Sequence, residues 1–371
     1  MKRSSLPATA EIADKCIECG ECQAECSFLQ KYGFPKKIAA AYRPADERHQ
    51  SIPFECSLCG LCAAVCPVNI DPSKMFLEMR REKVRRGGCD FPEHSRLLDY
   101  ERRGTSKRYT YYALPEKCDT IFFPGCTLSG TRFDMVMKLY EHMRNIDVSL
   151  GIVLDCCTKP SHDLGRQHHF EAMFGEMNTF LVENGVSNII VACPSCYAIF
   201  AGYGKGLSVQ TVYEVLAEKG LPITPSVSGI LTIHDPCTVR HQVPIHTAVR
   251  QIIAEKGIKL VEMQHHQGKT LCCGEGGAVG FLSPELAGKW SVLRKKEADG
   301  KMILTYCAGC ANFLGRYTPV AHLLDLVFEP ERTISGKSKI SKAPFTYLNR
   351  LRLKKTVKDR ISVQIWRERK V

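Results

Sequence analysis

Two runs of closely spaced cysteines near the N-terminus are the residues best suited to chemistry. The first run reads Cys16-x2-Cys19-x2-Cys22-x3-Cys26, and the second reads Cys56-x2-Cys59-x2-Cys62-x3-Cys66-Pro67. Two-residue spacings let three thiolates converge on three corners of a cubane, while the fourth cysteine ligates the other cluster. The pattern therefore predicts two [4Fe–4S] cubane clusters with crossed ligand sets. One set is Cys16, Cys19, Cys22 and Cys66, and the other is Cys56, Cys59, Cys62 and Cys26.

Zinc is the alternative occupant of these runs, because sets of four cysteines also bind zinc. Zinc ribbons use two CxxC pairs, whereas each run here has three cysteines at two-residue spacing and a fourth beyond them. The spacing therefore favours iron–sulfur clusters in residues 16–66.

Ten further cysteines form a duplicated pattern. The first copy is Cys126, Cys156-Cys157 and Cys193-x2-Cys196, and the second copy is Cys237, Cys272-Cys273 and Cys307-x2-Cys310. Because order, type and spacing recur, the pattern indicates an internal duplication. Cys89 and Cys118 belong to no set, and we expect them to be free thiols.

The elements that must position these cysteines follow from the residues between them. Strand-like runs precede most groups, at 120–123, 151–154, 188–191, 230–233 and 302–305. Helix-like segments at 135–144, 171–184 and 245–256 lie between the runs, so the chain predicts parallel α/β sheets. In such sheets ligands gather at the carboxyl ends of the strands, which is where these cysteines fall.

These motifs together resemble two known domains. The N-terminal runs resemble a two-cluster bacterial-type ferredoxin domain in its helical form, since 29 residues separate them. Cys193-Pro194-Ser195-Cys196 and Cys272-Cys273-Gly274 match the CCG cysteine-rich domain of heterodisulfide reductase catalytic subunits. The order of domains is similar to that in the D subunit of heterodisulfide reductases. It is also similar to the C subunit of anaerobic glycerol-3-phosphate dehydrogenase and to the glycolate oxidase iron–sulfur subunit.

The resemblance implies a non-cubane [4Fe–4S] cluster in each CCG domain, held by five thiolates, with zinc as the alternative in one domain. It implies cofactor-binding roles for Cys126, Cys156, Cys157, Cys193 and Cys196. It implies a catalytic role, in disulfide cleavage, for Cys237, Cys272, Cys273, Cys307 and Cys310. Both copies are complete here, whereas dehydrogenase relatives can have an incomplete first copy, and this favours disulfide chemistry.

Two smaller features near the cysteines can be explained by either a functional or a purely structural role. His234 and His162 are candidate proton donors near neutral pH, but a structural hydrogen bond is the favoured interpretation. The glycine-rich run at 274–280 is expected to be a turn that lets the backbone pass close to a cluster.

Composition limits the class of protein. The 371 residues are 44% hydrophobic, include 20 cysteines and carry a formal net charge of +12, which excludes a disordered chain and a small disulfide knot. No apolar run reaches the roughly 18 residues of a spanning helix, and no secretory signal is recognisable. We expect a cytoplasmic protein, with association with the cytoplasmic membrane face as an alternative. Reduced thiols in that compartment point to metal ligation.

The basic charge belongs to the C-terminal end. Residues 331–371 contain 13 Lys/Arg and three Asp/Glu. Leu348, Leu351, Val357, Ile361 and Ile365 recur there at near-helical spacing. The segment is expected to dock on anionic lipid or an acidic partner, or else to pack loosely as a solvated tail. Few aromatic residues accompany the charges, which disfavours nucleic acid.

The sequence therefore predicts an α+β multidomain protein. We expect a helical ferredoxin-type domain at 1–85 that includes a helix near 72–80, an irregular connector at 86–117, CCG domains at 118–228 and 229–330, and the basic tail at 331–371. The predicted function is an iron–sulfur oxidoreductase subunit in an anaerobic setting, passing electrons through the cubanes to the CCG clusters, which reduce a disulfide.

Two other functions are weighed against this one. The first is an electron relay that links a flavin hydroxyacid or glycerol-3-phosphate dehydrogenase to quinone, and the second is a zinc-loaded scaffold. Since the chain has no flavin motif and no CxxCH haem motif, a flavin- or haem-bearing partner subunit is expected.

Overall fold

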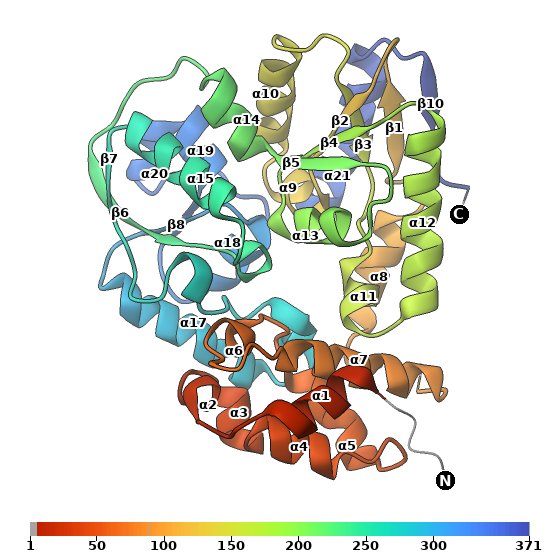
Figure 1. Cartoon of the computed structure of the whole chain (residues 1–371). Coiled ribbons are helices and arrows are strands. Elements are labelled where there is room, and N and C mark those ends of the chain that lie inside the picture. Colours follow the sequence, from red (N-terminus) through yellow and green to blue (C-terminus); the bar gives the residue numbers. More distant parts are fainter. Residues whose placement is uncertain (1–5, 89, 371) are drawn as a thin grey trace.

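The N-terminal part of the chain is a small helical unit, drawn in red and orange at the bottom of Figure 1. The computed structural model describes residues 6–88 and 90–370. Helix α1 (Pro7–Lys15) packs against α4 (Pro35–Ala41) and α7 (Pro72–Arg85). Shorter helices carry the cysteine loops: α2 (Glu21–Glu25), α3 (Ser27–Tyr32), α5 (Glu47–Ser51), η1 (Ile52–Glu55) and α6 (Leu61–Ala64). Asp71 caps the N-terminus of α7, because its carboxylate accepts from the Ser73 N–H at 2.9 Å, and Pro72 is the first residue of the helix.

The first α/β unit is built on a six-stranded sheet with strand order β10-β1-β3-β2-β4-β5. Its parallel strands are β2 (Thr120–Phe123), β3 (Gly151–Leu154), β4 (Asn188–Val191) and β5 (Ser208–Thr211). Around them lie α9 (Cys126–Thr131), α10 (Phe133–Arg144), α11 (Lys159–Asp163), α12 (Gln167–Glu183), α13 (Pro194–Tyr203) and α14 (Val212–Lys219). Most residues of β2, β3 and β4 are buried, as expected of a parallel sheet covered on both faces.

The second α/β unit repeats this order in a four-stranded parallel sheet, β7-β6-β8-β9. Its strands are β6 (Gly229–His234), β7 (Ile258–Val261), β8 (Ile303–Thr305) and β9 (Val320–His322). Its helices are η2 (Cys237–Val239), α15 (Val243–Glu255), η3 (Gln267–Lys269), η4 (Gly276–Ala278), α16 (Val279–Leu282), α17 (Pro284–Ala298), α18 (Ala308–Leu314), α19 (Leu323–Phe328) and α20 (Pro330–Ile334). Because β3-β2-β4-β5 and β7-β6-β8-β9 correspond strand by strand, the predicted duplication and fold class are confirmed.

The two α/β units share a hydrophobic core and polar contacts. Helices α14 and α15 pack together at their boundary. The hydroxyl of Tyr213 donates to the carbonyl of Tyr306 at 2.8 Å, and the buried Arg132 and Asp325 form an ion pair at 2.9 Å. The units are therefore fixed against each other by buried groups from both sides.

The connector and the tail differ from the irregular connector and the loose tail considered from sequence. The connector contains α8 (Ser95–Gly104) and β1 (Tyr111–Leu114), and β1 pairs antiparallel with β3. The tail forms α21 (Phe345–Arg360) and β10 (Ile365–Arg367), which extend the first unit (Figure 1). Leu353 and Val357 of α21 are fully buried, so the tail is part of a core. Sequence periodicity missed this because β1 and β10 are strands of four and three residues.

Several basic side chains of the tail are used within the fold. Arg369 pairs with the buried Asp155 at 2.7 Å, and Lys354 pairs with Glu368 at 2.9 Å. Among the described residues, none of the helices combines the length and apolar character needed to cross a bilayer.

Candidate iron–sulfur centres

The eight N-terminal cysteines lie in two neighbouring groups. One pocket is lined by Cys16, Cys19, Cys22 and Cys66, and Cys62 also lines it. In the second group, Cys26 interacts electrostatically with Cys56, Cys59 and Cys62. The fourth cysteine of each run thus lies near the first three of the other run.

Burial keeps several of these thiols protonated in the absence of a metal. Burial raises the pKa of Cys56 to about 12, although the neighbouring Arg80 guanidinium opposes this. Burial together with Cys16 and Cys19 raises the pKa of Cys22 to about 11. Since metal ligation requires thiolate, a bound cation must displace these protons.

The second duplicated set forms one connected group at the carboxyl ends of β6 and β8. The Cys272 thiol accepts from Cys237 and Cys273, which holds the pKa of Cys272 well below its usual range. Cys273 also contacts Cys310, which in turn contacts Cys307. All five predicted thiols of this set are therefore in side-chain contact in a chain.

The first duplicated set gathers in the same way at the ends of β2, β3 and β4. Cys126 contacts Cys156, and Cys193 contacts Cys196, which contacts Cys157. The Cys156 thiol donates to Cys126 and lowers the pKa of Cys126 to about 6. In the loop before α9, Gly125 has a φ of +78° and a Cβ there would lie 3.3 Å from the Cys196 sulfur, so a side chain at this position would be strained.

The three cysteine groups lie next to one another across domain boundaries. The Cys193 thiol of the first unit accepts from Cys307 of the second unit, which is one reason its pKa is lowered. Cys59 of the N-terminal unit lies beside Cys272 and Cys237. A continuous series of thiols therefore runs from the N-terminal unit to the second duplicated set and on to the first.

Two buried arginines hold the N-terminal unit against the duplicated units. Arg80 donates to the carbonyls of Cys56 at 2.6 Å, Asp163 at 2.7 Å and Gly277 at 2.9 Å, one from each unit. Arg240 donates to the Cys59 carbonyl at 3.0 Å. The spacing of the cysteines contains no signal for either arginine.

The glycine-rich run after Cys273 makes this junction close. A Cβ on Gly277, where φ is +60°, would lie 2.4 Å from the Cys56 carbonyl oxygen, and a Cβ on Gly276 would lie 2.5 Å from that of Ser57. The predicted turn is present, and it lets the N-terminal cysteine loop approach the second set. Glu275 of this run reaches solvent, yet the surrounding protein and the Cys193 and Cys272 thiols raise its pKa to about 7.

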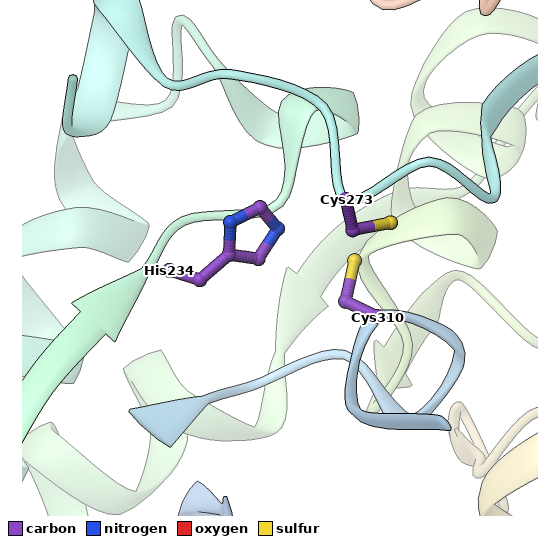
Figure 2. Close-up of side chains that lie close together, drawn as sticks. All are labelled: His234, Cys273 and Cys310. Atoms are coloured by element: carbon purple, nitrogen blue, oxygen red, sulfur yellow. The ribbon is translucent and has the colours of Figure 1, made fainter. Parts of the chain in front are cut away.

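His234 ends β6 and faces the second set (Figure 2). One of its ring nitrogens and the Cys273 and Cys310 sulfurs all lie within 4.8 Å of one another. Burial lowers the pKa of His234 to about 3, so the imidazole is neutral near pH 7. Neither ring nitrogen has a hydrogen-bond partner in the described part of the chain, so the favoured structural hydrogen bond is not made by its side chain.

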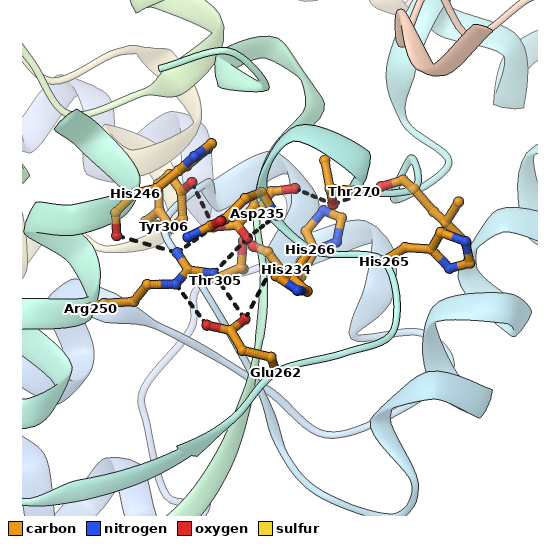
Figure 3. Close-up of polar contacts among 12 residues, drawn as sticks. His234, Asp235, His246, Arg250, Glu262, His265, His266, Thr270, Thr305 and Tyr306 are labelled. Carbon is orange, nitrogen blue, oxygen red and sulfur yellow. Dashed lines mark hydrogen bonds and ion pairs between the residues drawn. The ribbon is translucent and has the colours of Figure 1, made fainter. Parts of the chain in front are cut away.

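The loop around His234 is fixed by its neighbours (Figure 3). The Thr305 hydroxyl donates to the His234 carbonyl at 3.0 Å. Asp235 accepts from Arg250 at 2.9 Å and from the Tyr306 hydroxyl at 3.0 Å. Burial opposes ionisation of Asp235, but Arg250 outweighs it and lowers its pKa to about 2. The position of His234 therefore rests on backbone and neighbour contacts.

Other predicted residues have ordinary structural roles. His162 is bonded on both ring nitrogens, to Asp163 at 2.9 Å and to the Tyr203 hydroxyl at 2.8 Å. The Cys118 thiol donates to the Thr120 carbonyl at 3.3 Å and joins none of the three groups. Cys89 lies outside the described residues.

Two residues that the sequence analysis missed border the first set. Tyr100 of α8 lies against the Cys126 thiol, and Arg350 of α21 lies beside Cys126 and Cys156. The Arg350 guanidinium stacks on Tyr109 at 4.9 Å, and its buried Nη1 finds no partner among residues 6–88 and 90–370. Arg350 is one of many basic residues in its segment, so composition could not single it out.

The residues fit iron–sulfur centres. Converging thiols supply the preferred ligands, and the Cys56 and Cys272 sulfurs accept from backbone N–H groups at 3.4 Å and 3.3 Å. Buried nitrogens of His234, Arg294 and Arg350 have no protein partner within the described ranges, although burying such groups unpaired is costly. An anionic cluster among the thiols would use the converging sulfurs as ligands and could accept hydrogen bonds from these buried nitrogens.

This arrangement of a helical cysteine unit and two duplicated cysteine-bearing sheets defines a class of protein. Residues 12–70 match the 4Fe-4S dicluster domain family, and residues 120–201 and 231–315 each match the cysteine-rich domain family called CCG. The chain therefore joins one domain of the 4Fe-4S dicluster family to two domains of the CCG family.

The chain is also similar over most of its length to particular proteins. The chain is 28% identical over 332 residues to the B subunit of fumarate reductase (CoM/CoB) from Methanothermobacter marburgensis, covering 80% of this chain and 66% of that protein. It is 22% identical over 361 residues to the D subunit of dihydromethanophenazine:CoB–CoM heterodisulfide reductase from Methanosarcina barkeri, covering 81% and 88%. It is 23% identical over 305 residues to the EtfAB:quinone oxidoreductase of Syntrophomonas wolfei, covering 70% and 43%.

These similarities support the coarse function predicted from sequence. The chain has the domains of an iron–sulfur protein, and the three relatives described above are named as oxidoreductases or as subunits of them. The predicted anaerobic setting agrees with the methanogen relatives.

Proposed function

We propose that this chain accepts electrons from a flavin- or haem-bearing partner subunit and uses them to reduce a disulfide at its paired CCG centres. Two electrons and two protons convert the disulfide to two thiols, and the S–S bond is the bond that breaks. The observation that carries the proposal is the contact between Cys193 and Cys307, which joins the two sets across the domain boundary.

The proposed ligands are the cysteines brought together by the fold. Two cubanes would be held by Cys16, Cys19, Cys22 and Cys66, and by Cys26, Cys56, Cys59 and Cys62. Each duplicated set of five thiols would hold one non-cubane centre, with Cys237, Cys272, Cys273, Cys307 and Cys310 forming the catalytic set. Iron–sulfur centres supply one electron at a time, as the two steps of disulfide cleavage require.

Contacts between the units support the order proposed for the centres. Arg240 and Arg80 hold the loop of Cys56 and Cys59 against the second unit, and Gly276 and Gly277 let the two backbones approach closely. The second duplicated set therefore lies between the N-terminal unit and the first set. Glu275 and Lys159 lie beside the thiols of both sets, so a substrate entering there meets charged side chains.

A second candidate function is an electron relay between a flavin dehydrogenase and a quinone. The similarity to a protein named EtfAB:quinone oxidoreductase favours it. Docking of a partner on the exposed basic side chains of α21, such as Arg352 and Lys355, stays a prediction.

The test uses anaerobically purified protein. We expect iron and sulfide for two cubanes and two further centres, and a paramagnetic signal that depends on added thiol in freeze-quench EPR of oxidised protein. Stoichiometric zinc without iron would reject the proposal, and iron without a thiol-dependent signal would favour the quinone relay. Cys118→Ser is the matched control, because Cys118 joins none of the groups and its replacement should leave both measurements unchanged.

A further inference from the structure

The two copies of the duplicated unit differ at the last residue of the strand that leads to the first cysteine. Phe123 ends β2 three residues before Cys126, and His234 ends β6 three residues before Cys237. Both side chains are fully buried. The duplication therefore places an apolar ring in one copy and an imidazole in the same position of the other.

Phe123 is a conventional core residue. Its ring meets Phe200 edge-on at a centroid distance of 5.1 Å, and it belongs to the same hydrophobic cluster as Cys157 and Cys196. A phenyl ring needs no hydrogen-bond partner, so this environment is complete.

His234 faces the corresponding cysteines of the second copy, Cys273 and Cys310, within 4.8 Å (Figure 2). Its two ring nitrogens are buried without a partner in the described residues. Leaving a buried donor without a hydrogen bond is costly, and a phenylalanine at this position would avoid that cost, as the first copy shows. The position of the imidazole therefore suits a hydrogen-bond acceptor at or between these two thiols.

We propose that His234 donates an N–H hydrogen bond to a cysteine sulfur of the second CCG centre and makes that centre easier to reduce than the first. This inference rests on the proposed function, because it requires an iron–sulfur centre in the second copy. An imidazole that carries no charge still has one N–H, which can point at either thiolate. An added electron makes the sulfur more negative, so the donor stabilises the reduced state more than the oxidised state, and such hydrogen bonds set cluster potentials. No covalent bond forms or breaks.

The experiment compares reciprocal variants of the full chain by potentiometric titration followed by EPR, with iron and sulfide analysis of each sample. His234→Phe gives the second copy the ring of the first, and the one-electron equilibrium for reducing one centre should fall about tenfold, a shift of about 59 mV. Phe123→His should shift the other transition upwards, which assigns the two signals. His234→Gln keeps an N–H donor and should restore most of the lost potential.

Each outcome separates this inference from the proposed function. Unchanged potentials in His234→Phe with full iron would overturn the inference and leave the proposed function standing. Loss of iron in both His234→Phe and His234→Gln would also overturn it, because His234 would then be a ligand. Absence of iron from the second copy of the unaltered protein would contradict the proposed function itself.

Discussion

The two CCG units share the order of their four parallel strands and the pattern of their five cysteines, yet their surroundings differ. The second unit touches the N-terminal cysteine loop through Arg240 and the glycine-rich run, and it carries His234. The first unit is covered instead by the connector and the C-terminal segment, which supply Tyr100 and Arg350. The repeated motif therefore gathers five thiols in each unit, and the segments outside the repeat decide what surrounds them.

The two units also differ in where the ion-pair partner of a buried carboxylate comes from. Asp235 in the second unit pairs with Arg250 of the adjacent helix α15. Asp155 in the first unit pairs with Arg369, from the far end of the chain, and burial there outweighs the pairing and raises its pKa. The first unit thus depends on distant segments for stability, whereas the second unit is more self-contained.

The largest expected effect tests the order of the two centres. Cys272→Ser should abolish electron delivery to the first set, because the second set lies between it and the N-terminal unit. Cys156→Ser should leave reduction of the second set intact. Stopped-flow reduction with EPR sampling measures both. Equal loss of reduction in the two variants would contradict the proposed order.

Removing the distant cation should destabilise the first unit selectively. Arg369→Ala removes the ion-pair partner of the buried Asp155, which keeps its hydrogen bonds from Tyr112 and the Cys156 N–H, and breaking such a pair costs about 3–5 kcal/mol. Hydrogen exchange should rise in β2, β3 and β4 while β6 and β8 keep their protection. A uniform rise in both units would show that they unfold together and would remove the distinction.

The connector should make the first unit sensitive to pH. Burial raises the pKa of Glu101 to about 7, although the Ser161 hydroxyl and N–H donate to it. A raised carboxyl pKa stabilises the fold below its unfolded value of 4.5, and this contribution is lost as pH rises through about 7.

Glu101→Gln removes this titration. The unaltered protein should lose on the order of 2–3 kcal/mol of unfolding free energy between about pH 5 and about pH 8 through Glu101, and the variant should not have this loss. Chemical unfolding of both proteins at the two pH values measures the difference. Parallel behaviour of the two proteins would rule out a titrating Glu101.

The smallest effect is expected at the surface of the tail. Arg360 and Glu141 pair at 3.2 Å, but both side chains are more than half exposed. Arg360→Ala should change the free energy of unfolding by less than about 1 kcal/mol, as is usual for exposed pairs. It is the control for Arg369→Ala, and a comparable loss in both variants would mean that the tail acts through charge alone.

Local patterns were sufficient for much of the fold. The strands at 120–123, 151–154 and 188–191 coincide with β2, β3 and β4, because short apolar runs between helical segments have few other solutions. The short strands β1 and β10 and the helix α8 were missed, because each is stabilised by partners far away in the sequence. Arg80, Arg350 and Glu275 were missed for the same reason.

The sequence by itself determined the two cysteine runs and the duplicated pattern, and it predicted iron–sulfur clusters as the class of cofactor, since thiol spacing within one loop limits which ligands can converge. Only the tertiary structure decided that Cys59 meets Cys272 and that Cys193 meets Cys307. It also decided that the basic tail completes the first unit. Such contacts join residues that lie far apart in the chain, and they depend on how whole domains pack rather than on local spacing.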